Sequence, residues 1–108
     1  MAKFFCPYLK GEVELTDERA QHIGERHPEL LPENVNRLVE TLAQPDEVRR
    51  STWFQNAKLF SRWFEDFRGG KFVVAVVVTG FGTPKRHWII TAYVARKLVE
   101  GEVEWKQN

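Results

Sequence analysis

The sequence is poor in cysteine and in long apolar segments, and both absences limit what the protein can be. Its 108 residues include one cysteine, Cys6, so no disulfide can form within the chain and a reducing cytoplasm is the expected location. No apolar run approaches the roughly 18 residues of a membrane-spanning helix. The opening residues MAKFFCPYLK also lack the apolar stretch and cleavage site of a signal peptide. We therefore expect a protein without membrane contact.

The chain also lacks the common signatures of cofactor and metal chemistry. It contains no Gly-x-Ser-x-Gly elbow, and the Gly-Phe-Gly segment at 80–82 is neither a phosphate-binding loop nor a dinucleotide fingerprint. His22 and His27 are five residues apart, instead of the four that place two zinc ligands on one helix face. With one cysteine and the third histidine, His87, far along the chain, no zinc site is expected. We therefore expect no metal and no other cofactor.

What the chain does have is enough apolar residues for one folded domain. Hydrophobic residues make up 43% of the sequence, and the length fits a single domain over 1–108. Residues 3–13 are expected to form an irregular hairpin or an edge strand. Hydrophobic spacing and capping residues predict helices at about 17–27 and 32–43, then strands at about 47–53, 59–64, 72–78 and 87–95, with a short strand at 102–105. This order predicts an α+β fold, in which two N-terminal helices pack on a roughly four-stranded antiparallel sheet.

The net charge of +1 is an average over segments of opposite sign. Residues 1–48 carry five Lys+Arg against ten Asp+Glu, a net charge of −5. Residues 49–97, which hold the main predicted strands, carry ten against two, a net charge of +8, and the last eleven residues carry −2. A basic, aromatic-rich sheet can bind phosphates and stack bases, so the low net charge does not exclude an RNA partner. The alternatives are that most of these rings form the core and that the cations line solvated strand edges.

Three potential cations lie together on the first predicted helix. Arg19, His22 and Arg26 are three and four residues apart, which makes them neighbours on one flank. Neighbouring arginines disfavour imidazolium, and a neutral imidazole beside guanidinium groups suits a general base that must meet a phosphate. The alternative for His22 is a partly exposed histidine on an ordinary charged helix. The alternative for His27 is a residue that caps the helix carbonyls before Pro28.

The predicted strand at 87–95 offers partners for that histidine. Alternation predicts that the even-numbered residues from 88 to 94 face the core, which leaves Thr91 and Tyr93 on the opposite face. Arg96 and Lys97 follow directly. Thr and Tyr hydroxyls can donate to phosphate oxygens, and Arg and Lys can offset charge that develops at phosphorus. The alternative is a solvated strand face on which Thr and Tyr are common.

Four segments carry a resemblance to a known family. LTDERAQHIGERHPEL, QPDEVRRS, LFSRWFED and IITAYVARK resemble the PBECR group, the phage-associated nuclease-like domains of the Barnase–EndoU–colicin–RelE (BECR) superfamily. The resemblance extends from about Val13 to Lys97. It implies N-terminal helices against a four-stranded antiparallel sheet. It also implies a bacterial, toxin-like ribonuclease that cleaves RNA without a metal, through attack of the 2′-hydroxyl to give a 2′,3′-cyclic phosphate.

The resemblance also implies roles for individual residues. On this reading the catalytic residues are His22, Arg26 and Thr91, and the remaining family positions bind substrate: His27, Arg62, Tyr93, Arg96 and Lys97. RNA would be the partner, together with a cognate antitoxin or immunity protein if the protein acts as a toxin. The alternative function is a non-catalytic module that binds nucleic acid or a protein partner through the same basic sheet.

Overall fold

The N-terminal segment folds as a hairpin. In the computed structural model, which describes residues 1–108, strands β1 (Ala2–Cys6) and β2 (Gly11–Leu15) pair antiparallel around a short 3-10 helix, η1 (Pro7–Leu9). Lys10 adopts a left-handed conformation with φ of 57° and donates its N–H to the carbonyl of Pro7 over 3.0 Å, which closes the turn. The predicted irregular hairpin is therefore confirmed.

Two helices follow, close to their predicted positions. Helix α1 (Asp17–Arg26) begins where the Thr16 hydroxyl accepts the backbone N–H of Arg19 over 3.1 Å, which is a typical N-cap. It ends before Pro28, because a residue that precedes proline avoids the helical region. Helix α2 (Val35–Ala43) begins three residues later than predicted. The intervening residues form turns instead.

The remaining strands build most of the sheet. They are β3 (Glu47–Arg50), β4 (Ala57–Phe64), β5 (Lys71–Thr79), β6 (His87–Ala95) and β7 (Glu102–Lys106). Each overlaps a predicted strand, and β6 has the predicted bounds. The apolar run 72–78 lies in the middle of the sheet, where β5 pairs on both sides with β4 and β6.

The predicted sheet itself is wrong. The structure has a seven-stranded mixed sheet in the order β1-β2-β6-β5-β4-β3-β7, not two helices on a four-stranded antiparallel sheet. The N-terminal hairpin joins this sheet because β2 pairs in parallel with the start of β6, at His87 and Trp88. At the opposite edge, β7 pairs with β3 and adds another strand. Both additions connect segments far apart in sequence, which local periodicity does not specify.

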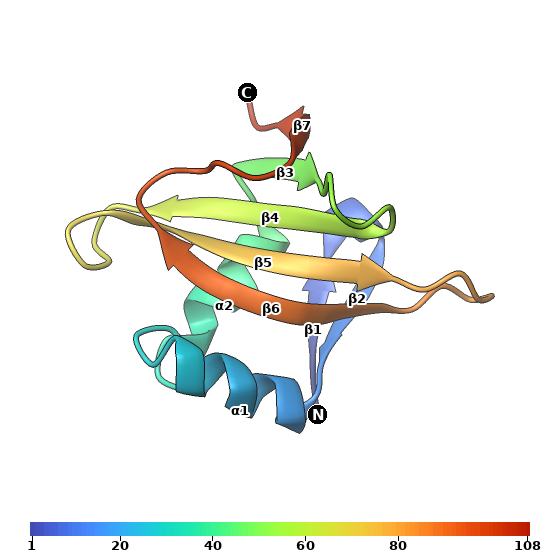
Figure 1. Ribbon diagram of the computed structural model, residues 1–108, viewed down its shortest axis with the longest axis horizontal. Coiled ribbons are helices and arrows are strands. Elements are labelled where there is room, and N and C mark those ends of the chain that lie inside the picture. The colour runs from blue at the N-terminus through green and yellow to red at the C-terminus, as the bar shows by residue number, and fades with distance from the viewer.

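The sheet curves until its two ends meet. Tyr8 in η1, next to β1, places its ring 5.9 Å from that of Trp105 in β7 and 5.8 Å from that of Phe60 in β4. Figure 1 shows β1, β2 and α2 behind β4, β5 and β6. The strands at the two ends of the pairing order are thus bridged by one side chain.

The core lies between the helices and the inner face of the sheet, which is the face that carries Phe60, Ala75 and Ala92. This cluster also buries Cys6 completely, and its thiol packs as a small apolar side chain. A smaller cluster around Leu59 and Val74 lies on the outer face. Neither helix is long and apolar enough to cross a membrane.

Helix α1 covers a free edge of the sheet. Beyond Trp88, β6 has no partner on the β2 side, and α1 packs there. The guanidinium of Arg19 donates to the backbone carbonyl of Ile90 over 3.3 Å, which satisfies part of this unpaired edge. Figure 1 shows α1 below β6 at this edge.

Candidate functional site

The largest hollow lies where β4 begins, β5 ends and β6 begins. It has a volume of about 700 Å³, and the N-terminal hairpin and β7 complete its wall. We call it the basin and define it by its lining residues: Tyr8, Leu9, Lys10, Gln55, Asn56, Lys58, Thr79, Gly80, Phe81, Lys85, His87 and Glu104. The closure of the curved sheet therefore creates it, because the residues of the hairpin turn and those of β7 meet only after β1 and β7 have approached each other.

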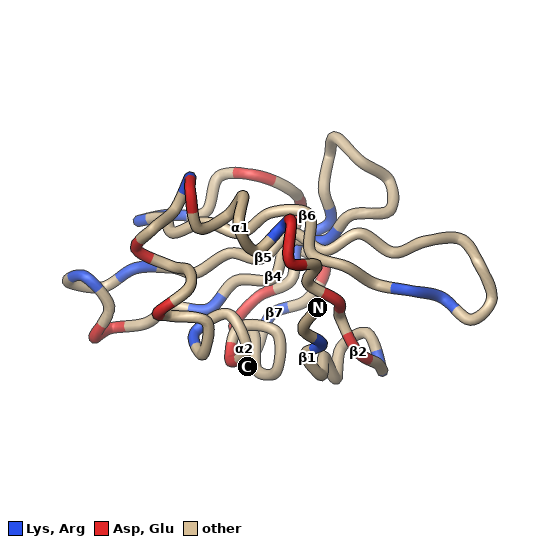
Figure 2. Tube along the Cα trace, turned by 90° about the horizontal axis from the view of Figure 1, so that it is seen from below, with Lys and Arg blue, Asp and Glu red and all other residues tan.

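Three lysines and one glutamate set the charge of the basin. Lys58 pairs with Glu104, with Nζ to oxygen distances of 2.7 and 2.9 Å. Lys10 and Lys85 have no ion-pair partner, so the basin retains two uncompensated cations. Figure 2 shows the Lys85–Arg86 pair in blue on the protruding loop between β5 and β6. Such a hollow favours an anionic ligand.

His87 is the only imidazole in the basin. Its Nδ1 lies 2.8 Å from the Thr79 hydroxyl, and its side chain is 9% exposed. Nε2 has no hydrogen-bond partner. Burial, and then the positive charge of Lys85, lower the pKa of His87 below its ordinary value of 6.5. The lowered pKa favours the neutral imidazole at pH 7, and in the tautomer whose Nδ1–H donates to the Thr79 hydroxyl, Nε2 carries the lone pair that can accept a proton.

Tyr8 and Glu104 form a second polar pair in the basin. The Tyr8 hydroxyl donates to Glu104 Oε2 over 2.6 Å. Burial, and then the hydrogen bond and charge of Glu104, raise the pKa of Tyr8 to about 12. For Glu104, burial acts to raise the pKa, but hydrogen bonds from Lys58 and Tyr8 and the nearby positive charges outweigh it, so the pKa is lowered. Tyr8 is thus a neutral donor, and Glu104 an anion that binds Lys58 and Tyr8 together.

The ionisation of Tyr8 gives a direct test of this pair. In a Tyr93→Phe background, which leaves one tyrosine, Tyr8 should ionise near pH 12 when phenolate absorbance is followed. Glu104→Gln should move the midpoint down toward the ordinary value of 10.0, because it removes the negative charge that opposes ionisation. Glu102→Gln, in the same strand but paired with Arg50, is the control and should leave the midpoint in place. An unmoved midpoint in Glu104→Gln contradicts the pair.

The predicted helix residues lie away from the basin. His22 and Arg26 are exposed on α1, and the shallow hollow beside His22 is lined only by residues of α1. Within the expected cationic flank, Arg19 is directed to the β6 backbone. The backbone N–H of His27 donates to the carbonyl of Ile23 at the helix end, as a capping residue does.

The predicted strand residues lie on the outer face of β6. A bulge at Ile90 shifts the alternation, so the core receives Ile89, Ala92 and Val94, whereas Ile90 and Tyr93 pack on the outer cluster. The predicted core face is therefore right after the bulge and wrong before it. Thr91, opposite Val76 on β5, shares the outer face. Arg96 and Lys97 are exposed beyond the end of β6.

One pair of predicted residues from the two elements comes together. The rings of His27 and Tyr93 are 6.4 Å apart, across the edge that α1 covers. Burial raises the pKa of Tyr93, with a further contribution from Glu100. Of the four main hollows, one is lined by His22 and none by Thr91, so none of the four gathers the three predicted catalytic residues.

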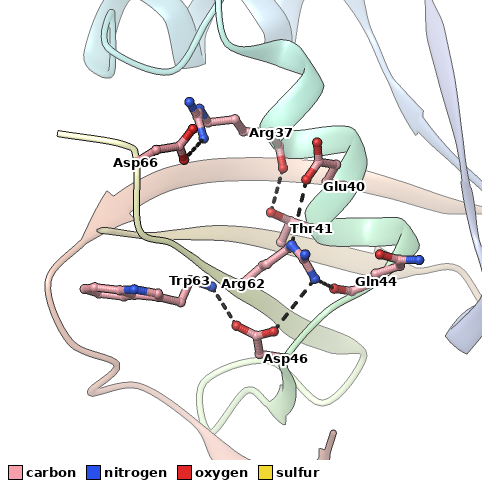
Figure 3. Close-up of polar contacts among 8 residues, drawn as sticks. All are labelled: Arg37, Glu40, Thr41, Gln44, Asp46, Arg62, Trp63 and Asp66. Atoms are coloured by element: carbon pink, nitrogen blue, oxygen red, sulfur yellow. Dashed lines mark hydrogen bonds and ion pairs between the residues drawn. The ribbon is translucent and has the colours of Figure 1, made fainter. Parts of the chain in front are cut away.

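Arg62 has partners within the fold. Its Nη1 donates to the carbonyl of Gln44 over 2.7 Å and lies 3.8 Å from Asp46, while its guanidinium lies 5.6 Å from the ring centre of Phe64. Asp46 in turn accepts the backbone N–H of Trp63 over 2.7 Å. Figure 3 shows this network between the end of α2 and β4. Arg62 therefore joins the helix to the sheet.

This network predicts a stability effect at Asp46. Asp46→Ala should lower the free energy of unfolding by about 1–3 kcal/mol, because it leaves the Trp63 N–H without its acceptor and removes a partner of Arg62. Urea denaturation measures the change. Asp66→Ala removes the exposed partner of Arg37 in the same region and should leave the stability nearly unchanged. Equal losses in the two variants would contradict the proposed role of Asp46.

The basin could not be recognised from sequence spacing. Tyr8 and Glu104 are 96 residues apart and meet only through the closure of the sheet. His87 attracted no prediction beyond its distance from the other histidines. One signal was available: a hairpin between 72–78 and 87–95 would place Thr79 opposite His87, as the structure does.

Neither a cofactor nor a family assigns a role to this site. No group of three or more His, Cys, Asp or Glu side chains is arranged to hold a metal ion. The chain matches no protein family model, no curated protein and no solved structure. The geometry of the basin and its electrostatics are therefore the basis for a functional proposal.

Proposed function

We propose that the protein is a metal-independent endoribonuclease whose reaction takes place in the basin. The observation that carries this proposal is His87, a neutral imidazole with a free Nε2, in a hollow with two uncompensated lysines. A base of this kind accepts a proton at neutral pH, and the cations attract the phosphate that must lie beside it.

The residues of the basin supply the groups that this reaction needs. His87 Nε2 removes the proton of an RNA 2′-hydroxyl, and the 2′-oxygen attacks the adjacent phosphorus. The bond from phosphorus to the 5′-oxygen breaks, and an ammonium group of the basin donates a proton to the leaving oxygen. Lys10 and Lys85 stabilise the charge that develops on the phosphoryl oxygens. The products are a 2′,3′-cyclic phosphate and a 5′-hydroxyl.

The sequence-based site on α1 and β6 is the competing location for the same reaction. There His22, Arg26 and Thr91 would act on RNA, with His27, Tyr93, Arg96 and Lys97 at the substrate. The contact between His27 and Tyr93 supports part of it. We favour the basin because it combines a hollow, an oriented imidazole and uncompensated cations in one place.

We further propose that this activity is exerted in the cytoplasm on cellular RNA. The free thiol of Cys6 is suited to a reducing compartment. A toxin of this kind would have a cognate antitoxin or immunity protein that prevents RNA from entering the site.

The decisive experiment is RNA cleavage in the presence of EDTA, with the product ends mapped. We expect 2′,3′-cyclic phosphate ends and no cleavage of a substrate whose 2′-hydroxyls are replaced by hydrogen. Binding of RNA without products would contradict the proposal and favour the alternative, a non-catalytic binding module. Cleavage that stops in EDTA would contradict the metal-independent mechanism.

A further inference from the structure

Two loops at the basin expose large aromatic side chains to solvent. The first loop, residues 51–56, connects β3 to β4, and the second, residues 80–86, connects β5 to β6. Phe81 is 86% exposed and Trp53 is 81% exposed, the two largest values among the large hydrophobic residues of the chain, and Phe54 is 58% exposed. Gln55 and Asn56 of the first loop line the basin, as do Phe81 and Lys85 of the second. Neither ring of the outermost pair contributes to the core, so packing does not explain their size.

Hydrogen bonds hold the first loop in a defined shape. The Ser51 hydroxyl accepts the backbone N–H groups of both Trp53 and Phe54 over 3.1 Å. The backbone N–H of Ser51 donates to the carbonyl of Ala57 over 3.0 Å, which closes the base of the loop. A loop fixed in this way presents its rings to solvent at a lower entropic cost on binding than a free segment would.

The two loops are also joined to each other. Asn56 Nδ2 donates to the Thr79 carbonyl over 3.0 Å, and the Thr79 N–H donates to the Asn56 carbonyl over 3.0 Å. The second loop is closed by the Gly80 N–H, which donates to the Arg86 carbonyl over 2.8 Å. Figures 1 and 2 both show the loops at the same end of the sheet. The loops that carry Trp53 and Phe81 are therefore linked to each other where they border the basin.

We propose that these loops form a stacking platform that selects single-stranded over duplex nucleic acid. Unpaired bases would stack on Trp53 and Phe81, while the phosphates pass over Lys10 and Lys85 in the basin. Bases within a duplex are already stacked and cannot reach such rings, whereas every unpaired base has an aromatic face. The two uncompensated cations of the basin, Lys10 and Lys85, favour a polyanion over an apolar protein surface.

This inference rests on the proposed function for the path of the phosphates, and it adds the class of substrate. Stacking does not distinguish ribose from deoxyribose, so single-stranded DNA should bind about as tightly as RNA of the same sequence. The 2′-hydroxyl matters for cleavage and not for binding. Single-stranded DNA is therefore a ligand that the proposed chemistry cannot consume.

The test measures binding of labelled twelve-residue oligonucleotides to the whole protein by fluorescence anisotropy. Single-stranded DNA should bind at least about tenfold more tightly than the corresponding duplex. Trp53→Ala and Phe81→Ala should each weaken single-strand binding about tenfold, and Trp53→Phe, which keeps a ring, should stay within about threefold of the wild type. Val99→Ala removes a 74% exposed apolar side chain after β6 and is the control without effect.

Salt dependence separates the rings from the cations. Lys85→Ala should reduce the slope of log affinity against log salt by about 0.7, whereas Trp53→Ala should leave it unchanged. Equal affinity for duplex and single strands, alanine variants that match Val99→Ala, or no nucleic-acid binding at all would overturn the inference. Ring-dependent binding without RNA cleavage would refute the proposed function and leave the platform standing. RNA cleavage that is unchanged in Trp53→Ala and Phe81→Ala would support the proposed function and refute the platform.

Discussion

Replacement of His87 by alanine is expected to lower the rate of RNA cleavage by about 10²–10⁴-fold, which is the usual contribution of a general base. The reason is local: no other imidazole lines the basin, and the Thr79 hydroxyl fixes this ring through Nδ1. His22→Ala is the matched control, since it removes an exposed imidazole from α1. Normal activity in His87→Ala together with loss in His22→Ala would move the site to the helix.

The pH profile gives a second readout of the same residue. Because burial and the charge of Lys85 hold the pKa of His87 below 6.5, the rate should fall only as the pH drops through that lowered value. Lys85→Gln removes the repelling charge and should move this acidic limb to higher pH. A limb that does not move, measured under kcat/KM conditions, would show that His87 is not the titrating base.

His87 should also make the folding stability depend on pH. Its pKa is lower in the folded protein than in the unfolded chain, so the unfolded chain binds more protons as the pH falls below 6.5. The contribution of His87 to the free energy of unfolding is therefore fully present above pH 6.5 and is lost as the pH falls through its lowered pKa. His87→Ala should remove this part of the pH dependence, which denaturant titrations at several pH values can measure.

Local signals were sufficient to predict most elements of the fold. Thr16 and Pro28 mark the two ends of α1, and alternation with turn residues placed β6 at its observed bounds. The pairing of these elements was not predictable in the same way. The parallel contact of Val13 with His87 joins residues 74 positions apart, and nothing in the periodicity of either segment specifies it. The four-stranded prediction failed for this reason.

The site was less predictable than the fold because it depends on a one-residue bulge and on a few individual side-chain contacts. The bulge at Ile90 changes which side chains of β6 face the core, and a pattern of alternation contains no sign of it. Arg62 resembled a substrate-binding cation, yet the end of α2 supplies it with a carbonyl and a carboxylate. The basin depends on the contact between Tyr8 and β7, which exists only in the closed sheet.

That closure predicts that a core substitution will act on both stability and the basin. Phe60 is fully buried in the core beneath Tyr8, with its ring at 80° to the tyrosine ring. Phe60→Ala should lower the free energy of unfolding by about 3–5 kcal/mol, from lost burial and the cavity that remains. Since domains are commonly stable by about 5–15 kcal/mol, part of the variant population could unfold, and Phe60→Leu serves as the milder variant.

The pKa of Tyr8 distinguishes a loosened basin from a merely weakened core. If Phe60 supports the closure, Phe60→Leu should lower the midpoint of Tyr8 ionisation from about 12 toward 10.0, because water then reaches the hydroxyl. Val73→Ala, which removes another fully buried side chain of the same cluster and lies opposite Val94 instead of β7, is the matched control. It should reduce the stability and leave the Tyr8 midpoint near 12. If both variants lose stability and neither moves the Tyr8 midpoint, Phe60 contributes to the core alone, and the basin keeps its shape through the bond between Tyr8 and Glu104.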